Sequence, residues 1–458
     1  MVFRIILPVL LAHFGERIFG MATYTDTQIM MTLAALTADG ATARPSGETP
    51  AQQSARIGQG ITAQLALTGL ATQGGWSLSW AGLTQSGANL AYIAQGPNDS
   101  DGNSVYALVL RGTVMGDPID MAEDMQVGLV LPFAAGGTPS IGSMPNISQG
   151  AMQAFTDIVM GTDLLTQLAT LAPYTLYVVG HSLGGAMATT VALFLQQQAS
   201  AGTLSISSIL PYTFAAPTAG DAAFAAWFGK QFPSAVCTYN KYDLVPTAWA
   251  TLASLPGDFI SNPFYPGPKA NPAGPGPTAE PLNEVGILIT TVAGETNGNT
   301  YVQPTQQAAL NGGSSPLFLE SYPAAATSSV QQFELQVAFQ HSGNTYLTLL
   351  EAPTIPSSAP VVASVSPTSG SSAGGTSVTI TPPSGSTFTS DCVVDFGIVP
   401  AASQTVASDG SSITAVSPAG YGTVDIRVTN MFGTSPAVPV YPNLSGNDYS
   451  DQFTFTAS

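Results

Sequence analysis

The sequence predicts two domains of different class, an α/β domain that ends near residue 353 and an all-β domain after it. In the first part, apolar strand-like runs alternate with helical stretches, which is typical of a parallel sheet covered by helices. In the second part, short β-branched runs recur about every ten residues between Gly, Ser and Pro, as in a β-sandwich. A chain of 458 residues is long enough to bury a core in each domain.

Two runs in the α/β part, 105–110 and 175–179, are apolar throughout, which predicts strands at the centre of a sheet covered on both faces. The segment 256–281 is rich in Pro and Gly, so we expect an irregular excursion on the surface. Further elements expected from apolar spacing are a long helix over 149–171, a helix over 186–198, and strands over 235–239 and 285–291.

The predicted domain boundaries follow changes in composition. Residues 21–353 form the α/β domain, 354–358 a short Pro/Ser linker, and 359–458 the all-β domain. Residues 1–20 have two interpretations that the sequence leaves open, a signal peptide or an N-terminal extension, because an apolar run is followed by Glu16 and Arg17.

Charge and composition exclude several classes of function. Only 9 Lys and Arg face 27 Asp and Glu, so a nucleic-acid partner is not expected. With three His and two Cys in the whole chain we expect no metal and no cofactor, and we expect Cys237 and Cys392 to be free buried thiols. Beyond the leader no stretch of eighteen uncharged apolar residues occurs, so an integral membrane protein is not expected.

A Gly-x-Ser-x-Gly pattern occurs twice, around Ser182 and around Ser372. A serine nucleophile on a sharp turn needs an apolar strand before it and a helix after it. Ser182 has both, whereas Ser372 lies in a Gly/Ser turn between short strands. The sequence therefore predicts Ser182 as the nucleophile.

The base and the acid follow by elimination and by chain order. His13 lies in the leader and the side chain of His181 is expected to point away from its neighbour Ser182, which leaves His341. The acid must lie between Ser182 and His341, and Asp243 directly follows a predicted strand. Asp258 is the rival candidate.

An oxyanion hole needs two backbone N–H donors. We expect one from Leu183, which follows the nucleophile, and the other from Thr113, which follows the strand 105–110.

These motifs, in this order, resemble the fungal-type (class-three) triacylglycerol lipases, which have the α/β-hydrolase fold. The resemblance covers about residues 84–350 and implies the triad Ser182, Asp243 and His341, with Thr113 and Leu183 as the oxyanion hole. The matching motifs are Arg111-Gly112-Thr113, Gly180-His181-Ser182-Leu183-Gly184-Gly185-Ala186, Phe214-Ala215-Ala216-Pro217, Asp243-Leu244-Val245-Pro246 and His341.

The resemblance also implies that residues 114–127 form a mobile lid. Met115, Ile119 and Met121 would be the apolar lid residues that contact acyl chains. Asp124 resembles the acid that supports the oxyanion hole in this family. A fixed helix packed on the sheet is the alternative. The long Pro/Gly-rich interval between Asp243 and His341 leaves the shape of the acyl pocket open.

The C-terminal part resembles an IPT/TIG immunoglobulin-like domain. The motifs are Val365-Ser366-Pro367-Thr368-Ser369-Gly370, Gly374-Gly375-Thr376, Val394-Asp395-Phe396-Gly397 and Val424-Asp425-Ile426-Arg427-Val428-Thr429-Asn430. The domain carries no candidate catalytic group, so we expect a spacer or a module that contacts a surface or carbohydrate.

The sequence thus favours a secreted or cell-surface bacterial hydrolase that acts on an ester or lipid substrate, at an oil–water interface if it is a triacylglycerol lipase. Short-chain, feruloyl, phospholipid and polyester esterase activities are alternatives on the same fold. A catalytically silent surface-binding protein is the alternative from another class.

Overall fold

The computed structural model describes most of both domains. The described residues are 24–37, 48–84, 89–112, 126–135, 137, 143–255, 263–269, 284–310, 317–322, 326–356, 359–435 and 451–457.

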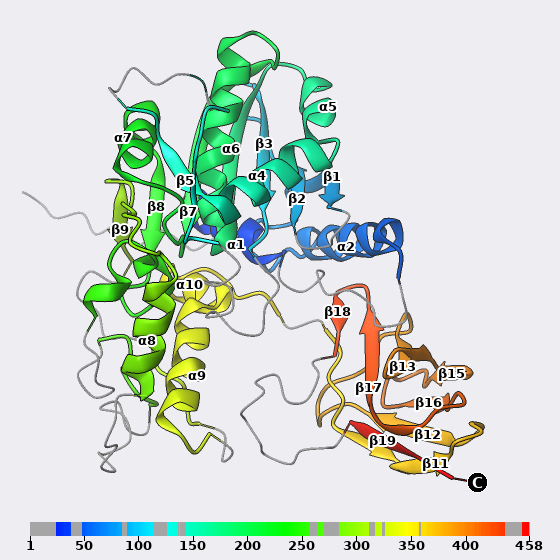
Figure 1. The fold of residues 1–458 in the computed structure, drawn as a ribbon. Helices are drawn as coiled ribbons and strands as arrows, with labels where there is room; N and C mark the ends of the chain where they lie inside the picture. Colours follow the sequence, from blue (N-terminus) through cyan, green and yellow to red (C-terminus); the bar gives the residue numbers. More distant parts are fainter. Residues whose placement is uncertain are drawn as a thin grey trace, which may run out of the picture.

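A seven-stranded sheet with the order β1-β2-β3-β6-β7-β8-β9 forms the centre of the first domain (Figure 1). The strands from β3 onward are parallel, while β1, β2 and β3 pair antiparallel. Their bounds are β1 Ser77–Leu83, β2 Leu90–Gln95, β3 Ser104–Leu110, β6 Tyr174–His181, β7 Ile206–Phe214, β8 Val236–Tyr239 and β9 Gln307–Ala309. Parallel strands bring their carboxyl ends to one edge of the sheet, which is where such folds place their sites.

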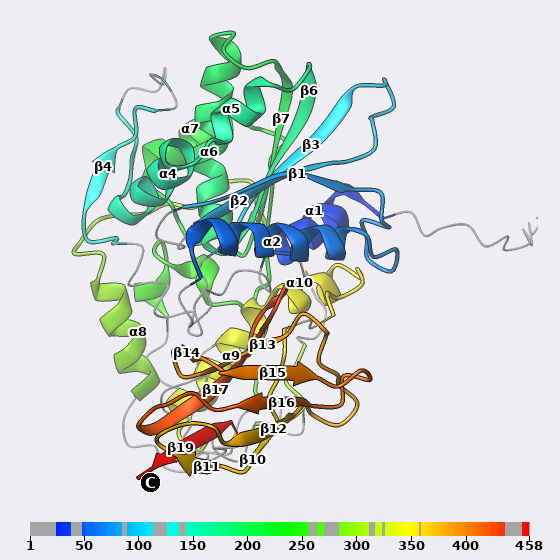
Figure 2. The ribbon, with the colours of Figure 1, turned by 90° about the vertical axis from the view of Figure 1, so that its right-hand side faces the viewer.

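Helices cover both faces of this sheet, as Figures 1 and 2 show. One core contains side chains of α4 (Gln149–Gly161), α6 (Leu183–Ser200) and α7 (Ala222–Gln231). The other core contains side chains of α1 (Asp26–Ala35), α2 (Pro50–Leu65) and α10 (Gly343–Leu349). The other helices and small strands of the described part of this domain are α5 Leu164–Ala169, α8 Glu284–Gly294, α9 Ser329–His341, β4 Val130–Pro132, β5 Asn146–Ser148 and the 3₁₀ turns Val245–Thr247 and Leu252–Ser254.

The predicted strands 105–110, 175–179 and 235–239 are confirmed as β3, β6 and β8, and the predicted helix 186–198 lies within α6. The prediction of one helix over 149–171 was wrong. The backbone of Thr162 is extended, with φ −127° and ψ 174°, so the helix ends at Gly161 and α5 begins separately.

The prediction of a strand over 285–291 was also wrong, because this run belongs to α8. Val285, Ile289 and Val292 are buried at the i, i+4, i+7 spacing of a helix face. A short apolar run fits a buried strand and a buried helix equally well, so periodicity alone misassigned it.

The second domain is a sandwich of a four-stranded sheet, β10-β12-β16-β15, and a six-stranded sheet built around β17. Apolar side chains from both sheets form one core, in which Phe396, Phe453 and Phe455 pack ring against ring. The strands are β10 Ser364–Ser366, β11 Ser369–Ser371, β12 Ser377–Thr381, β13 Val393–Phe396, β14 Val399–Pro400, β15 Ser403–Val406, β16 Ile413–Val416, β17 Gly422–Asn430, β18 Gly433–Thr434 and β19 Gln452–Thr456.

The two domains meet at α2, which lies between the large sheet and the sandwich in Figures 1 and 2. A Cβ on Gly60 of α2 would lie 2.8 Å from the carbonyl oxygen of Met431, so only glycine allows this approach. Ile355 is buried with the side chains of α1 and α10, although it falls in the predicted linker. The packed part of the first domain therefore extends to at least Ile355.

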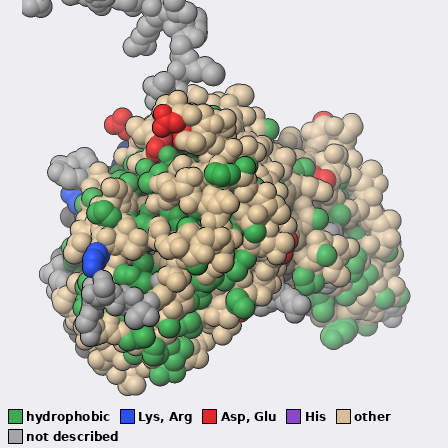
Figure 3. Space-filling model, turned by 90° about the horizontal axis from the view of Figure 1, so that it is seen from above, with side chains coloured by type: hydrophobic (Ala, Val, Ile, Leu, Met, Phe, Trp, Pro, Cys, Tyr) green, Lys and Arg blue, Asp and Glu red, His purple; other side chains and the backbone are tan. Residues whose placement is uncertain are grey.

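Charged side chains are few on the face of the molecule shown in Figure 3, as the composition implies. Cys237 and Cys392 are both free and buried, as predicted. Among the helices of the described ranges, none has the length and apolar character needed to cross a bilayer.

Candidate active site

Ser182 lies on a sharp turn between β6 and α6. Its φ of 61° and ψ of −135° are strained for a residue with a side chain, and such strain is typical of functional turns. The turn closes because its neighbours lack side chains: a Cβ on Gly180 would overlap the carbonyl oxygen of Gly184, and one on Gly184 would overlap that of Leu110. The sequence therefore forces the hydroxyl of Ser182 out at the carboxyl edge of the sheet.

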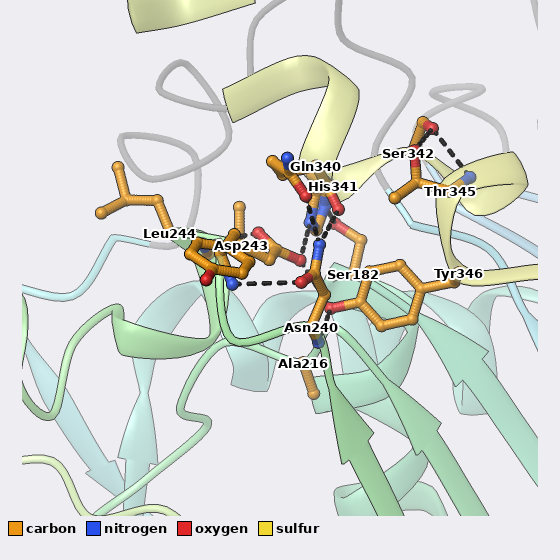
Figure 4. A network of polar contacts seen from close by, with 12 residues as sticks. Ser182, Ala216, Asn240, Asp243, Leu244, Gln340, His341, Ser342, Thr345 and Tyr346 are labelled. Atoms are coloured by element: carbon orange, nitrogen blue, oxygen red, sulfur yellow. Dashed lines mark hydrogen bonds and ion pairs between the residues drawn. The ribbon is translucent and has the colours of Figure 1, made fainter. Parts of the chain in front are cut away.

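A chain of hydrogen bonds joins Ser182, His341 and Asp243 (Figure 4). Nε2 of His341 lies 2.8 Å from Oγ of Ser182, and Nδ1 lies 2.8 Å from Oδ2 of Asp243. His341 is the last residue of α9, and Asp243 lies in the turn after β8. All three are buried, with exposed fractions of 6%, 8% and 1% for Ser182, His341 and Asp243. The structure thus brings together the three residues that the sequence singled out.

The carboxylate of Asp243 is held by two further donors. The N–H of Val245 donates to Oδ1 at 3.0 Å, and the hydroxyl of Tyr346 donates to Oδ2 at 2.7 Å. Burial and the charge of Asp243 raise the pKa of Tyr346 well above its usual value, so this phenol stays protonated and remains a donor. These bonds orient the carboxylate toward His341.

Asn240 links the turn that carries Asp243 to the helix that carries His341. Its backbone N–H donates to the hydroxyl of Tyr346 at 2.9 Å, and its Nδ2 donates to Oε1 of Gln340 at 2.6 Å. Asn240 and Gln340 are fully buried, so these bonds are not exchanged with water. Sequence reasoning missed Tyr346, Asn240 and Gln340, because no local motif marks a partner about 100 residues away.

We expect Tyr346→Phe to lower kcat by about 10-fold and to leave KM nearly unchanged, because the carboxylate loses one hydrogen bond to a charged acceptor. The matched control is Tyr177→Phe, since the hydroxyl of Tyr177 donates to Asp26 at 2.9 Å away from the site. Steady-state kinetics on a soluble ester measure both variants. Equal kcat values for the two would show that the bond to Asp243 has no effect on the reaction.

The N–H of Leu183 belongs to the first residue of α6, where helix geometry provides no acceptor within the helix. The positive end of the helix dipole points the same way, so this N–H is suited to bind an anion. Gly112, two residues after the end of β3, lies against the turn, where an added Cβ would lie 3.0 Å from Cβ of Ser182. Thr113, Met115, Ile119, Met121, Asp124 and Asp258 lie outside the described residues, so their predicted roles stay predictions.

The other histidine of the motif, His181, lies closer to the site than the sequence suggested. Its ring packs against that of His341, with centroids 4.8 Å apart. Successive side chains of a strand point to opposite faces, which is why the sequence predicted no contact. His341 comes to His181 from α9, and that approach depends on tertiary packing.

The second Gly-x-Ser-x-Gly match has none of this setting. Ser372 follows β11 in the sandwich, and its N–H donates to the carbonyl of Thr456 in β19. No helix begins after it, since β12 is the next element. The sequence was right to set it aside.

The fold is that of an α/β-hydrolase, and its candidate site joins a buried serine, a histidine and an aspartate in one chain of hydrogen bonds. Residues 107–252 match the family model "Lipase (class 3)", and residues 360–454 match the model "IPT/TIG domain". These matches agree with both resemblances: residues 107–252 are similar to class 3 lipases and residues 360–454 to IPT/TIG domains, and the chain is a serine ester hydrolase. Comparison with curated protein sequences gives no match.

Several solved structures of lipases are similar to this chain. M37 lipase is 22% identical, with a TM-score of 0.53 over 71% of this chain and 93% of its own. A deletion mutant of the lipase of Rhizomucor miehei in complex with its propeptide is 20% identical, with a TM-score of 0.33 over 50% of this chain and 63% of its own. The lipase of Rhizopus microsporus var. chinensis is 21% identical, with a TM-score of 0.34 over 50% and 70%. At this identity the first likeness supports the fold alone.

Proposed function

We propose that Ser182, His341 and Asp243 hydrolyse carboxylic esters through an acyl-enzyme. His341 takes the proton of Ser182 as its Oγ attacks the ester carbonyl, and then gives it to the departing alcohol. Water then attacks the acyl carbonyl and loses a proton to His341, and His341 gives that proton to Oγ of Ser182 as the acid departs, which restores both the serine and the base. The observation that carries the proposal is the pair of 2.8 Å hydrogen bonds in the chain Ser182–His341–Asp243.

The oxyanion of each tetrahedral intermediate would be bound by the N–H groups of Leu183 and Thr113. The position of Leu183 at the start of α6 supports the first donor. The contact of Gly112 with the turn supports the second, because it places the end of β3 beside Ser182.

Within this chemistry we propose triacylglycerols as the substrate, which would make the protein a lipase acting at an oil–water interface. The family description supports this choice over short-chain, feruloyl, phospholipid or polyester substrates. Residues 114–127 would then be the lid. The C-terminal end of this segment is attached to the domain, because the carbonyl of Val127 accepts a hydrogen bond from the hydroxyl of Tyr301 at 2.7 Å.

A substrate panel tests the lipase proposal. Initial rates are measured on emulsified tributyrin and triolein and on soluble p-nitrophenyl esters of increasing acyl-chain length. We expect higher rates on the esters with long acyl chains. The rate on tributyrin should rise as its concentration passes the solubility limit. A preference for short soluble esters with no such rise would assign the protein to the esterases. Ser182→Ala is the blank for spontaneous hydrolysis.

Two proposals concern where the protein works. Secretion is supported by the apolar run 5–11 near the N-terminus and by the low charge of the chain. Contact of the IPT/TIG domain with a surface or with carbohydrate is supported by its position as a separate sandwich beyond α2. Binding of the full-length Ser182→Ala protein to glycans and to cells, against a variant truncated after residue 358, would test this contact.

A further inference from the structure

His181 ends β6, and its ring packs against two residues of the site. The ring centroids of His181 and His341 lie 4.8 Å apart with planes tilted by 40°, and the ring of Tyr346 lies 5.3 Å away at 83°. The hydrogen bonds of the chain Ser182–His341–Asp243 do not use this ring. His181 therefore lies beside the reacting groups without a part in the mechanism above.

The imidazole of His341 is held at two atoms of its edge, Nδ1 by Asp243 and Nε2 by Ser182. Two such bonds leave one motion free, the rocking of the ring plane about the line through these atoms. The N–H of Nε2 lies in the ring plane, and a hydrogen bond weakens steeply when its donor points off line. A rocked ring would therefore aim its proton away from the oxygen of the departing alcohol. The ring of His181 lies against His341 and opposes this rocking.

The charge of His181 matters because His341 becomes an imidazolium during the reaction. Burial lowers the pKa of His181 well below its usual value and the nearby His341 lowers it further, while a hydrogen bond with the backbone of His341 acts in the opposite direction. His181 is thus neutral when the cation forms. A neutral aromatic ring attracts a cation, whereas a second imidazolium would repel it.

Packing alone does not account for a histidine at this position. Nε2 of His181 is buried and has no hydrogen-bond partner among the described residues. A buried polar atom without a partner destabilises the fold, so an apolar ring would serve packing better. We propose that His181 is a positioning residue, which fixes the ring plane of His341 for proton delivery to the leaving group. This inference rests on the proposed triad.

Two esters with the same acyl group separate this role from a structural one. The departing alcohol of ethyl butyrate must receive the proton from His341 as the C–O bond breaks, whereas p-nitrophenolate leaves without it. We expect His181→Ala to lower kcat/KM by about 100-fold for ethyl butyrate and by about 10-fold for p-nitrophenyl butyrate. His181→Gln, which removes the ring but keeps a polar side chain of similar length, should show the same ratio.

The control is Val191→Ala, which removes a buried contact from α6 away from the site and should leave both kcat/KM values unchanged below its melting temperature. Equal losses of His181→Ala and His181→Gln on the two esters, or no loss on either, would overturn the role of His181. Retained activity in Ser182→Ala would refute the triad itself, so the two failures are distinguishable.

Discussion

Replacing Ser182 with alanine is expected to lower kcat by about 10⁵- to 10⁶-fold, which is the largest effect of any single substitution in this chain. Without its hydroxyl no acyl-enzyme forms. The turn and the donor of Leu183 persist, so only the residual rate that an oxyanion site gives to attack by water remains. The fold should be unchanged, because alanine fills the same space in the turn.

Hydrolysis of p-nitrophenyl butyrate by purified protein measures this loss. The chain supplies a matched control in Ser372→Ala, which changes the centre of the second Gly-x-Ser-x-Gly pattern in the sandwich. This variant should keep kcat within twofold. A Ser182→Ala protein that is folded by circular dichroism and retains a tenth of the wild-type rate would refute the assignment of the nucleophile.

Asp243→Asn is expected to lower kcat by about 10⁴-fold, as the loss of the orienting carboxylate does in serine hydrolases. An amide that turns its NH₂ toward Nδ1 of His341 favours the tautomer with the proton on Nε2, and that nitrogen can no longer accept the proton of Ser182. An amide also carries no charge to stabilise the imidazolium. In the wild type, Tyr346 and Val245 each donate a hydrogen bond to one carboxylate oxygen of Asp243. In the variant, one of these two donors would face the NH₂ group of asparagine instead of an oxygen.

Steady-state kinetics with the same ester measure the effect. Asp221→Asn is the control, because Asp221 caps α7 through Phe224 away from the site, and asparagine caps a helix as well as aspartate does. Its activity should equal that of the wild type. A loss below tenfold in Asp243→Asn would mean that another carboxylate orients His341, with Asp258 the first to test.

The chemistry of this site could be predicted from the sequence because few residues competed for each role. With three histidines in the chain, elimination led to His341, although 159 residues separate it from Ser182. The strand before Ser182 and the helix after it are local patterns, and they distinguished this serine from Ser372. Chain order and a preceding strand then selected Asp243.

The residues that surround the triad could not be predicted in this way. Tyr346 and Asn240 reach Asp243 and the end of α9 only after the helices have packed on the sheet, and their contacts span about 100 residues. His181 meets His341 for the same reason. A short apolar run such as the one in α8 fits a buried strand and a buried helix equally well. Which of the two forms depends on how the run is buried in the tertiary structure.

The most direct test of the central claim is to identify the residue that becomes covalently modified. The protein is treated with a fluorophosphonate, which reacts with activated serines, and is then analysed as intact protein and as peptides by mass spectrometry. We expect a single adduct on the peptide that contains Ser182, loss of ester hydrolysis in parallel with its formation, and no adduct in Ser182→Ala. An adduct on another serine that accompanies the loss of activity, or full activity in the protein modified at Ser182, would contradict the claim.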